Sequence, residues 1–217
     1  MKILVIGKGT MGNLIFISLK ERYKNDKKTI IDNVSLDKDR IIKKDYDYII
    51  DFSHPDSIKH YKYFLNQKTK IIIGTTNFNE EQEEYLLFLS KMNPIVKDVN
   101  FSKGLLMLKK FLNLNKELIK EYHIELIETH HESKIDKPSG TAKSICKLIN
   151  VDELVSIRNE DLNSSHLVKL SNEFEKIEIN HVVYDKEIFM IGILESIAFL
   201  NKQKNGLFSY QDVIEWN

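Results

Sequence analysis

The first half of the chain alternates short apolar runs with segments whose apolar residues recur at helical spacing. The apolar runs lie at residues 2–6, 29–31, 46–53 and 70–76. Continuous runs of this length suit strands that are buried on both faces of a parallel sheet. After the first run, Met11, Leu14, Ile15 and Leu19 follow helical spacing. Strands that alternate with helices in this rhythm predict a parallel α/β sheet.

Helix-start signals follow two of the later runs. Ser53 and Asp56 are N-cap candidates before a helical pattern that begins at Ile58. Asn79 and Gln82 have the spacing of a capping box, in which each side chain bonds the other residue's backbone N–H. The pattern therefore predicts a helix after each of these strands.

The pattern changes after about residue 100. A long amphipathic helix is predicted over residues 103–121, followed by a strand over 123–131. Three β-like segments without intervening helices then follow, at 154–158, 166–170 and 175–183. This order predicts a second, smaller α+β domain with an open antiparallel or mixed sheet. A last helix over 189–201, with the residues after it, could return to the first domain.

Composition narrows the class of protein. The 217 residues carry 32 basic and 32 acidic side chains, so no net charge draws the chain to nucleic acid or an anionic membrane. No apolar run approaches the roughly 18 to 20 residues that span a bilayer, and the first run is too short for a secretory signal. The single cysteine, Cys146, cannot form an internal disulfide. We therefore expect a cytoplasmic protein with neither nucleic acid nor membrane as a partner.

A glycine-rich turn joins the first strand to the first helix. "GKGTMG" matches G-x-G-x-x-G, a weak motif alone, but here it follows a buried strand and opens a helix. Gly7 would permit the tight turn, Gly9 the approach of a pyrophosphate, and Gly12 close helix packing. The alternative is a glycine turn that binds nothing. The cofactor contacts expected here come from Gly7, Gly9, Thr10, Met11 and Gly12.

The end of the second run adds an acidic residue. Asp32 lies 20 residues beyond Gly12, where it would accept hydrogen bonds from a ribose hydroxyl. A carboxylate at this place favours NADH slightly over NADPH. The cofactor expected is therefore NADH or NADPH, and the first domain is expected to be of the dinucleotide-binding Rossmann type.

Two later strands end in small polar residues. Ligands bind outside the carboxyl ends of the strands of an open parallel sheet. Taken singly, each of these residues could be only a helix cap or a turn, but together they line one edge. The further cofactor contacts expected there are Phe52, Ser53, Gly74, Thr75 and Thr76.

The stretch "ETHHESKIDKPSGTAKSI" combines titratable and anion-binding groups. His130 and His131 are neighbours at a strand end and therefore point to opposite faces, so they serve different purposes. Imidazole titrates near neutral pH and suits a proton donor, whereas Lys134 supplies a fixed positive charge. The run from Ser139 to Thr141 places hydroxyls and N–H groups at a helix N-terminus, where an anion can bind.

Three other interpretations of this stretch remain open on these residues alone. The two histidines could be surface residues, and Ser139, Gly140 and Thr141 could form only a helix cap. A metal site is a further alternative, but consecutive His130, His131 and Glu132 lack the usual spacing of zinc ligands, so no metal is expected.

With these residues assembled, the chain resembles the 4-hydroxy-tetrahydrodipicolinate reductase (dihydrodipicolinate reductase) family nearly from end to end. The resemblance rests on "GKGTMG", "DFSHP", "GTTNF" and "NFSKG", and most specifically on "HHESKIDKPSGTA" at residues 130–142. It implies NAD(P)H-dependent reduction of a small cyclic dicarboxylate in the diaminopimelate route to lysine. It also implies a homotetramer built through the sheet of the second domain.

The resemblance carries roles to individual residues. His130 takes the place of the general acid, and Lys134 that of the residue that binds or polarises the substrate. Substrate carboxylates would be held by His131, Ser139, Gly140 and Thr141, with Thr76 between nicotinamide and substrate. Asn100 and Phe101 would belong to the hinge side of the cofactor site. The domains implied are a dinucleotide-binding domain at 1–102, completed by 189–217, and a substrate-binding and oligomerisation domain at 103–188.

The chain departs from the family pattern in three places. The glycine turn is one residue shorter than the longer family form, Lys137 replaces a small residue before Pro138, and Lys186 replaces an arginine. A lysine keeps the charge of arginine but loses its planar fork. Two alternatives to the reductase are an aspartate dehydrogenase-like NAD(P)-dependent enzyme and a catalytically silent nucleotide-binding protein.

Overall fold

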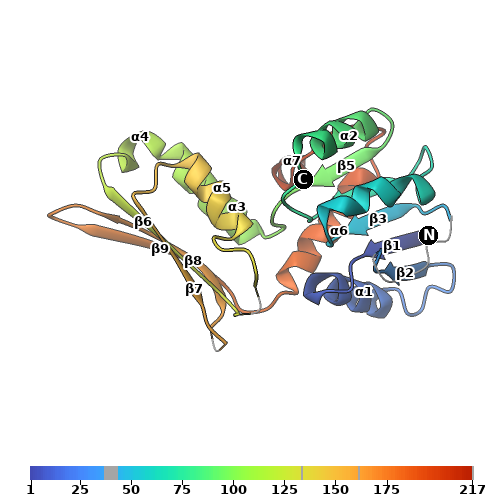
Figure 1. Cartoon of the computed structure of the whole chain (residues 1–217), viewed down its shortest axis with the longest axis horizontal. Helices are drawn as coiled ribbons and strands as arrows, with labels where there is room; N and C mark the ends of the chain where they lie inside the picture. The colour runs from blue at the N-terminus through green and yellow to red at the C-terminus, as the bar shows by residue number, and fades with distance from the viewer. Residues whose placement is uncertain (37–43, 133, 161, 217) are drawn as a thin grey trace. The chain divides into compact units, whose positions relative to one another are not determined.

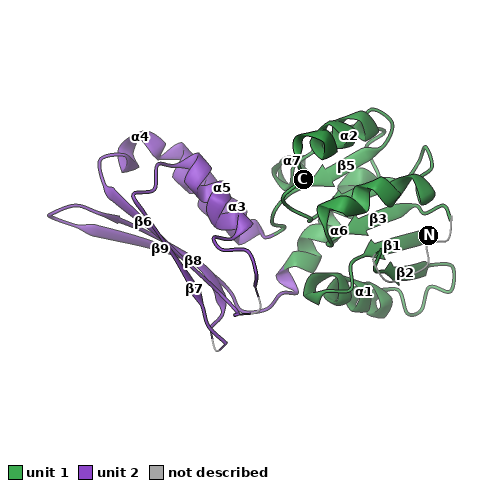
Figure 2. Cartoon of the chain, viewed as in Figure 1, with its two compact units in different colours: residues 1–101, 189–217 green, residues 102–188 purple. Residues whose placement is uncertain are grey.

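A computed structural model describes residues 1–36, 44–132, 134–160 and 162–216 of the chain. The chain divides into two compact units, which Figure 2 shows in different colours. Unit 1 comprises residues 1–101 and 189–217, and unit 2 comprises residues 102–188. Two stretches of chain that are distant in sequence therefore build unit 1, whereas one continuous stretch builds unit 2.

Unit 1 is built on a parallel sheet of six strands. Its elements are β1 (Lys2–Ile6), α1 (Thr10–Arg22), β2 (Ile30–Val34), β3 (Tyr48–Asp51), the 3-10 helix η1 (Pro55–Tyr63), β4 (Lys70–Ile73), α2 (Glu80–Ser90), β5 (Pro94–Lys97), α6 (Ile188–Leu200), β10 (Gly206–Phe208) and α7 (Tyr210–Trp216). The strand order is β10-β5-β4-β3-β1-β2, and every neighbouring pair is parallel. The predicted parallel α/β sheet is confirmed.

Both faces of this sheet are buried, because alternate residues of each strand enter different cores. Ile3 and Val5 of β1 pack with residues of α1, α6 and α7 on one face. Leu4 and Ile6 pack with residues of η1 and α2 on the other face. A strand of continuous apolar residues is what such a double-sided environment requires. Figure 1 shows α1 and α6 near β1, with the segment after residue 188 returning to the sheet.

The structure of unit 1 corrects one prediction, confirms a second and adds two strands that were not predicted. The predicted helix after the third strand is the 3-10 helix η1, and its N-cap is His54 rather than Ser53 or Asp56. The capping box of Asn79 and Gln82 is confirmed at the start of α2. Strands β5 and β10 were not predicted, because each is only three or four residues long and carries little periodicity.

Unit 2 packs helices on one face of a mixed sheet. Its elements are α3 (Lys103–Leu114), α4 (Lys116–Ile119), β6 (His123–His130), α5 (Gly140–Leu148), β7 (Glu153–Arg158), β8 (Ser164–Ser171) and β9 (Lys176–Val183). The order is β7-β6-β8-β9, with β6 parallel to β7 and antiparallel to β8. The mixed sheet is confirmed, but the single helix predicted over 103–121 is wrong, since it is interrupted at Asn115.

One face of the unit 2 sheet changes character along its length. Residues paired directly across strands share a face. The covered face is apolar toward the start of β6, where Leu126 and Val168 are paired and pack with α3 and α5. Toward the end of β6 the same face carries polar side chains. These are Glu128, His130, Ser156, Arg158, His166 and His181. The sheet thus continues from a hydrophobic core into a polar cluster.

No helix in the described part of the chain is long and apolar enough to cross a membrane.

Candidate active site

The glycine turn of unit 1 is tightly built at two of its three glycines. Gly7 has a positive φ of 115°, a conformation that L side chains rarely adopt. A Cβ at Gly12 would lie 2.0 Å from the carbonyl oxygen of Gly7, so a side chain there would displace backbone. Gly9, by contrast, has nothing within 4 Å of its would-be Cβ. Gly7 and Gly12 are therefore required by the fold, and Gly9 is not.

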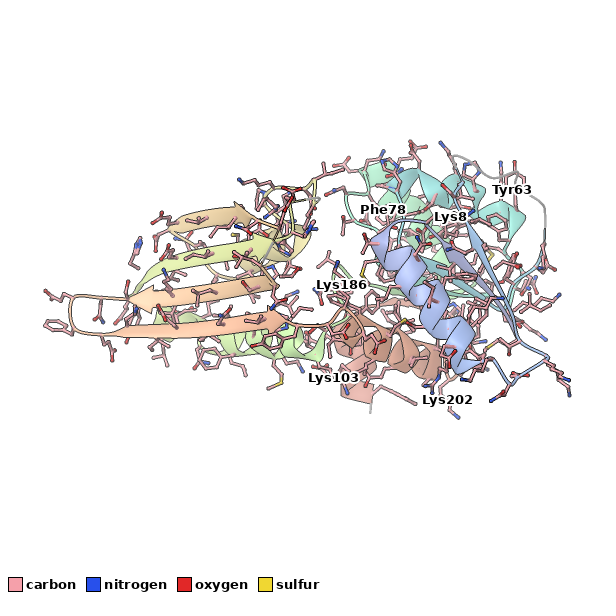
Figure 3. The ribbon with its side chains drawn as sticks, turned by 90° about the horizontal axis from the view of Figure 1, so that it is seen from below. Lys8, Tyr63, Phe78, Lys103, Lys186 and Lys202 are labelled. Carbon is pink, nitrogen blue, oxygen red and sulfur yellow. The ribbon has the colours of Figure 1, made fainter. Side chains whose placement is uncertain are left out.

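The turn places the N-terminus of α1 among exposed residues. Gly9 is the N-cap of α1, and no side chain caps that end of the helix. Lys8 and Thr10 are exposed on either side of it, and Figure 3 labels Lys8 at this turn. A helix N-terminus with backbone N–H groups and a bare glycine beside it fits a pyrophosphate. These residues therefore fit the dinucleotide that the motif predicts.

Asp32 is the middle residue of the neighbouring strand β2, not its last residue as predicted, and two groups hold its side chain. Its Oδ2 accepts hydrogen bonds from Nζ of Lys44 at 2.6 Å and from the hydroxyl of Tyr46 at 2.7 Å. Partial burial acts to raise the pKa of Asp32, but these two hydrogen bonds outweigh it and leave that pKa below its usual value. Asp32 is therefore a fixed carboxylate with a lysine at its side.

A buried carboxylate organises the ends of β3 and β4. Asp51 is fully buried and accepts hydrogen bonds from Ser53, Thr75, Ser57 and Tyr61. Burial raises the pKa of Asp51 against the effect of these donors. The hydroxyls of Ser53 and Thr75, both expected to contact the cofactor, are therefore turned toward Asp51. These two residues could contact a ligand through their backbone groups, or through their hydroxyls if these give up the hydrogen bonds to Asp51.

Aromatic rings stand beside the same strand ends. Phe52 is half-buried, and its ring would collide with any side chain at Gly74, whose would-be Cβ lies 2.1 Å from it. The rings of Phe52 and Phe101 are 5.7 Å apart, and Phe101 is buried. Gly74 is thus needed so that the ring of Phe52 can lie against β4. Thr76 follows on the same segment and is half-buried.

In unit 2 the polar cluster centres on Glu128, which is fully buried. Its Oε2 lies 2.6 Å from Nδ1 of His130, and its Oε1 accepts a hydrogen bond from Nη2 of Arg158 at 2.9 Å. The backbone N–H of Ser139 also reaches Oε1, at 3.3 Å. Burial acts to raise the pKa of Glu128, but these donors hold it well below its ordinary value. Glu128 is therefore ionised, and one histidine and one arginine share its charge.

The loop after β6 contains a carboxylate, that of Asp136, which neighbouring residues of the same loop and of α5 bind. Oδ1 of Asp136 lies 2.7 Å from Nζ of Lys134, and Oδ2 accepts a hydrogen bond from the N–H of Gly140 at 3.2 Å. Ser139 is the N-cap of α5, and its hydroxyl accepts from the N–H of Ala142 at 3.1 Å. Lys134 and the N-terminus of α5 can therefore hold one carboxylate jointly.

Two further histidines continue the cluster across the sheet. The ring of His166 lies 5.2 Å from that of His130 and 6.4 Å from that of His181. Burial, with His130 nearby, lowers the pKa of His166 to about 3. Burial also lowers the pKa of His181, whose Nε2 lies 3.2 Å from the hydroxyl of Ser102. His166 is therefore neutral at physiological pH.

Glu128, His130 and His166 are also a set of potential metal ligands. One ligand atom from each lies within 4.8 Å of the others, the one such group found among the residues that the structure describes. The guanidinium of Arg158 is bonded to the same carboxylate, so a cation there would face a fixed positive charge. The arrangement favours proton chemistry over metal binding.

Comparison with known proteins places both units in one family. Residues 1–101 match the family model for the dihydrodipicolinate reductase N-terminus, and residues 104–214 match the model for its C-terminus. The chain belongs to the dihydrodipicolinate reductase family. A 4-hydroxy-tetrahydrodipicolinate reductase from Thermosipho africanus is 35% identical over 99% of this chain and 98% of that protein. One from Buchnera aphidicola subsp. Cinara cedri is 36% identical over 89% of this chain and 80% of its own length.

A solved structure agrees on the fold. The dipicolinate-bound dihydrodipicolinate reductase of a Paenisporosarcina species superposes with a TM-score of 0.68, covering 96% of this chain and 97% of its own. The sequence identity is 20%. The resemblance inferred from the motifs is thereby confirmed at the level of family and fold.

The structure brings some of the expected residues together and leaves others apart. His130 and Ser139 meet at Glu128, and Lys134 and Gly140 meet at Asp136. Thr141 is buried in the first turn of α5. His131 is exposed just beyond the end of β6. Lys186, which the resemblance places where the family has an arginine, is exposed and precedes α6. Figure 3 labels it.

Sequence reasoning overlooked Glu128, Asp136 and Asp51. Glu128 has the same strand parity as Ile124 and Leu126, so an acid on the buried face was already visible in the sequence. Asp51 likewise ends an otherwise apolar strand. A charged side chain at a core position signals a paired group, because an unpaired buried charge is too costly to keep. That signal would have found both residues.

Proposed function

We propose that this chain catalyses the NAD(P)H-dependent reduction of 4-hydroxy-tetrahydrodipicolinate to tetrahydrodipicolinate, a step of the diaminopimelate route to lysine. In the balanced reaction the substrate takes up one hydride and one proton and releases water. The observation that carries the proposal is the juxtaposition, within unit 2, of a buried Glu128–His130 pair with a carboxylate-holding lysine and helix N-terminus.

In unit 2, one residue would donate the proton and others would bind the carboxylates of the substrate. His130 is proposed to donate the proton to the substrate carbon next to the one that receives hydride. Lys134, with the N–H of Gly140, would bind a substrate carboxylate in place of Asp136. His131, Ser139 and Thr141 would complete the grip on the two carboxylates. Positioned acid–base groups of this kind typically contribute about 10²- to 10⁴-fold to a rate.

The residues of unit 1 would hold the cofactor. A bound nicotinamide cofactor supplies the hydride. The turn from Gly7 to Gly12 and the N-terminus of α1 would bind its pyrophosphate. Asp32 would bind the adenine-side ribose, and Phe52, Gly74, Thr76, Asn100 and Phe101 would line the nicotinamide side, with Ser53 and Thr75 supporting through Asp51.

Steady-state assays with enzymatically generated 4-hydroxy-tetrahydrodipicolinate and NADH or NADPH test this function. Consumption of reduced cofactor with formation of tetrahydrodipicolinate is expected. A protein that binds cofactor but shows no turnover with either would instead be the catalytically silent nucleotide-binding protein. Turnover with aspartate and oxidised cofactor would favour an aspartate dehydrogenase-like enzyme, which has no use for the full run from His130 to Ala142.

Asp32 is expected to set a modest preference for NADH. Its fixed negative charge should repel a 2′-phosphate and accept a ribose hydroxyl. In Asp32→Ala, Lys44 loses its partner and becomes available to a phosphate. We expect the NADPH-to-NADH ratio of kcat/KM to rise by about tenfold. Asp26→Ala, another acid of unit 1 that is exposed, serves as the control; an unchanged ratio in Asp32→Ala would exclude Asp32 from the cofactor site.

We further propose that the chain assembles as a homotetramer through the face of the unit 2 sheet that α3 and α5 do not cover. That face carries apolar side chains that do not belong to the unit 2 core. They are Ile127, Val155, Ile157, Leu167 and Val182. Analytical ultracentrifugation is expected to give about four times the chain mass of 25.5 kDa. A monomer at all concentrations up to 100-fold above assay conditions would contradict the proposal.

A further inference from the structure

The buried pair of Glu128 and Arg158 touches both residues to which the proposed chemistry is assigned. Glu128 lies two residues before His130 on β6, and Arg158 is the register partner of His130 on β7. The side chain of Arg158 is 12% exposed and that of Glu128 is 0% exposed. An ion pair so far from water is held by geometry rather than screened by salt. Its location next to the proposed acid raises the question of its role.

The contact with Glu128 determines which nitrogen of His130 carries hydrogen. An ionised carboxylate can only accept hydrogen bonds. Oε2 of Glu128 lies 2.6 Å from Nδ1 of His130, which is an ion-pair distance at which a bare nitrogen lone pair would be repelled. We infer that Nδ1 carries the hydrogen when the imidazole is neutral. Nε2 is then the nitrogen that exchanges a proton with substrate. After donation from Nε2, the ring is left in the neutral form that Glu128 already stabilises.

Arg158 connects the same carboxylate to the loop that carries Lys134. Its Nη2 donates to Oε1 of Glu128 at 2.9 Å and to the carbonyl oxygen of Asp136 at 2.6 Å. Its Nε donates to the carbonyl oxygen of Lys134 at 3.4 Å. The backbone on either side of Ile135 is therefore fixed to the sheet by one guanidinium. Movement of Glu128 would loosen both His130 and this loop.

Other charged or titratable groups face the pair from the neighbouring elements. His166 of β8 packs its ring against His130, and His181 of β9 lies beyond it. Lys134 and Asp136 lie on the loop, paired with each other. His166 is neutral in the folded protein. Glu128 is therefore the group that lies at ion-pair distance from both His130 and Arg158.

We propose that Glu128 is a positioning residue, which fixes His130 as the Nδ1–H tautomer and, through Arg158, fixes the loop of Lys134. This rests on the proposed role of His130 as proton donor. Glu128 itself does not contact substrate in this scheme. Its first effect on the reaction is to keep the Nε2 proton of the imidazolium available to the substrate carbon. Its second is to keep the carboxylate-binding Lys134 correctly placed relative to His130.

The tautomer of His130 in the wild-type protein gives the first test. Long-range ¹H–¹⁵N correlation spectra, at a pH where the ring is neutral, distinguish protonated from unprotonated ring nitrogens. The His130 signal is assigned by its absence in His130→Gln. We expect an Nδ1–H ring; a predominantly Nε2–H ring overturns the proposal. This measurement needs no turnover, so it is decided independently of whether the proposed reaction occurs.

Substitutions at Glu128 give the second test. Glu128→Gln removes the charge and can place an NH₂ group opposite Nδ1, so the Nε2–H tautomer should appear and kcat should fall at least 50-fold. Glu128→Asp keeps the charge and should retain the Nδ1–H ring, with a smaller loss of kcat. Glu117→Gln, which removes an exposed carboxylate paired with Lys120, is the control.

The outcomes separate a positioning role from a structural one. If Glu128→Gln loses activity but its His130 stays Nδ1–H, Glu128 supports only the fold and the proposal fails. If Glu128→Gln does not fold, the tautomer in the wild type and in Glu128→Asp decides. If the wild type has no turnover but shows the Nδ1–H ring that Glu128→Gln loses, the positioning stands and the proposed function fails.

Discussion

His130→Gln is expected to lower kcat by about 10³-fold while the protein stays folded. Glutamine fills a similar volume and can still meet Glu128 with its amide, but it cannot deliver a proton near neutral pH. The loss should appear equally in kcat and kcat/KM, because the proton is needed only in the transition state. Steady-state kinetics with saturating reduced cofactor, alongside circular dichroism of both proteins, measure the effect.

Two histidines of the same region provide the contrast for His130. His123 is exposed at the other end of β6, and His123→Gln should leave both constants within twofold of wild type. His131 is proposed to bind a carboxylate, so His131→Gln should raise KM and leave kcat nearly unchanged. A His130→Gln protein with near-normal kcat would remove His130 from its role as proton donor.

Replacing Gly12 with alanine is expected to destabilise unit 1 severely, whereas the same change at Gly9 is not. A methyl group at Gly12 would stand 2.0 Å from the carbonyl oxygen of Gly7, and only a shift of backbone relieves that contact. Overpacking typically costs about 1–3 kcal/mol of the free energy of unfolding. We expect the upper end of this range at Gly12, because the neighbouring atoms are backbone. Denaturant unfolding, followed by circular dichroism, measures this loss.

Gly9→Ala tests the ligand instead of the fold. Its methyl group meets no protein atom within 4 Å, so the free energy of unfolding should fall by no more than about 1 kcal/mol, the cost of alanine at the N-cap of α1. If the pyrophosphate lies against Gly9, the methyl group occupies the place of the ligand, and the Kd for NADH should rise at least tenfold. An unchanged Kd, measured by calorimetry, would mean that the cofactor does not approach this turn.

The architecture of unit 1 was predictable because its signals are local. The strand at 2–6 is uniformly apolar, and the capping box of Asn79 and Gln82 is a spacing rule that tertiary structure does not alter. The failures have physical causes. Asn115 interrupts the helix predicted over 103–121, although the residues on both sides continue the apolar pattern, since an asparagine competes for backbone hydrogen bonds.

The candidate site was predictable in its residue types but not in its connections. The motif indicated His130 and Lys134, because imidazole and ammonium groups near a helix N-terminus have recognisable chemistry. Ser53 and Thr75 turn toward Asp51, and Asp136 forms an ion pair with Lys134. Both arrangements depend on contacts made by the folded strands and loops. Such contacts leave no periodicity in the sequence, so only the folded chain reveals them.

Because the chain leaves unit 1, builds unit 2 and then returns, the two units cannot be completed in the order in which they begin. Unit 2 is one continuous stretch, but the sheet of unit 1 gains its edge strand β10 only after residue 205, and one of its two cores includes Met190, Ile193 and Val213. Translation proceeds from the N-terminus, so until α6 and α7 are made only α1 covers this face of the unit 1 sheet. If synthesis stops after unit 2 has emerged from the ribosome but before α6 has, unit 2 can be complete while unit 1 is not.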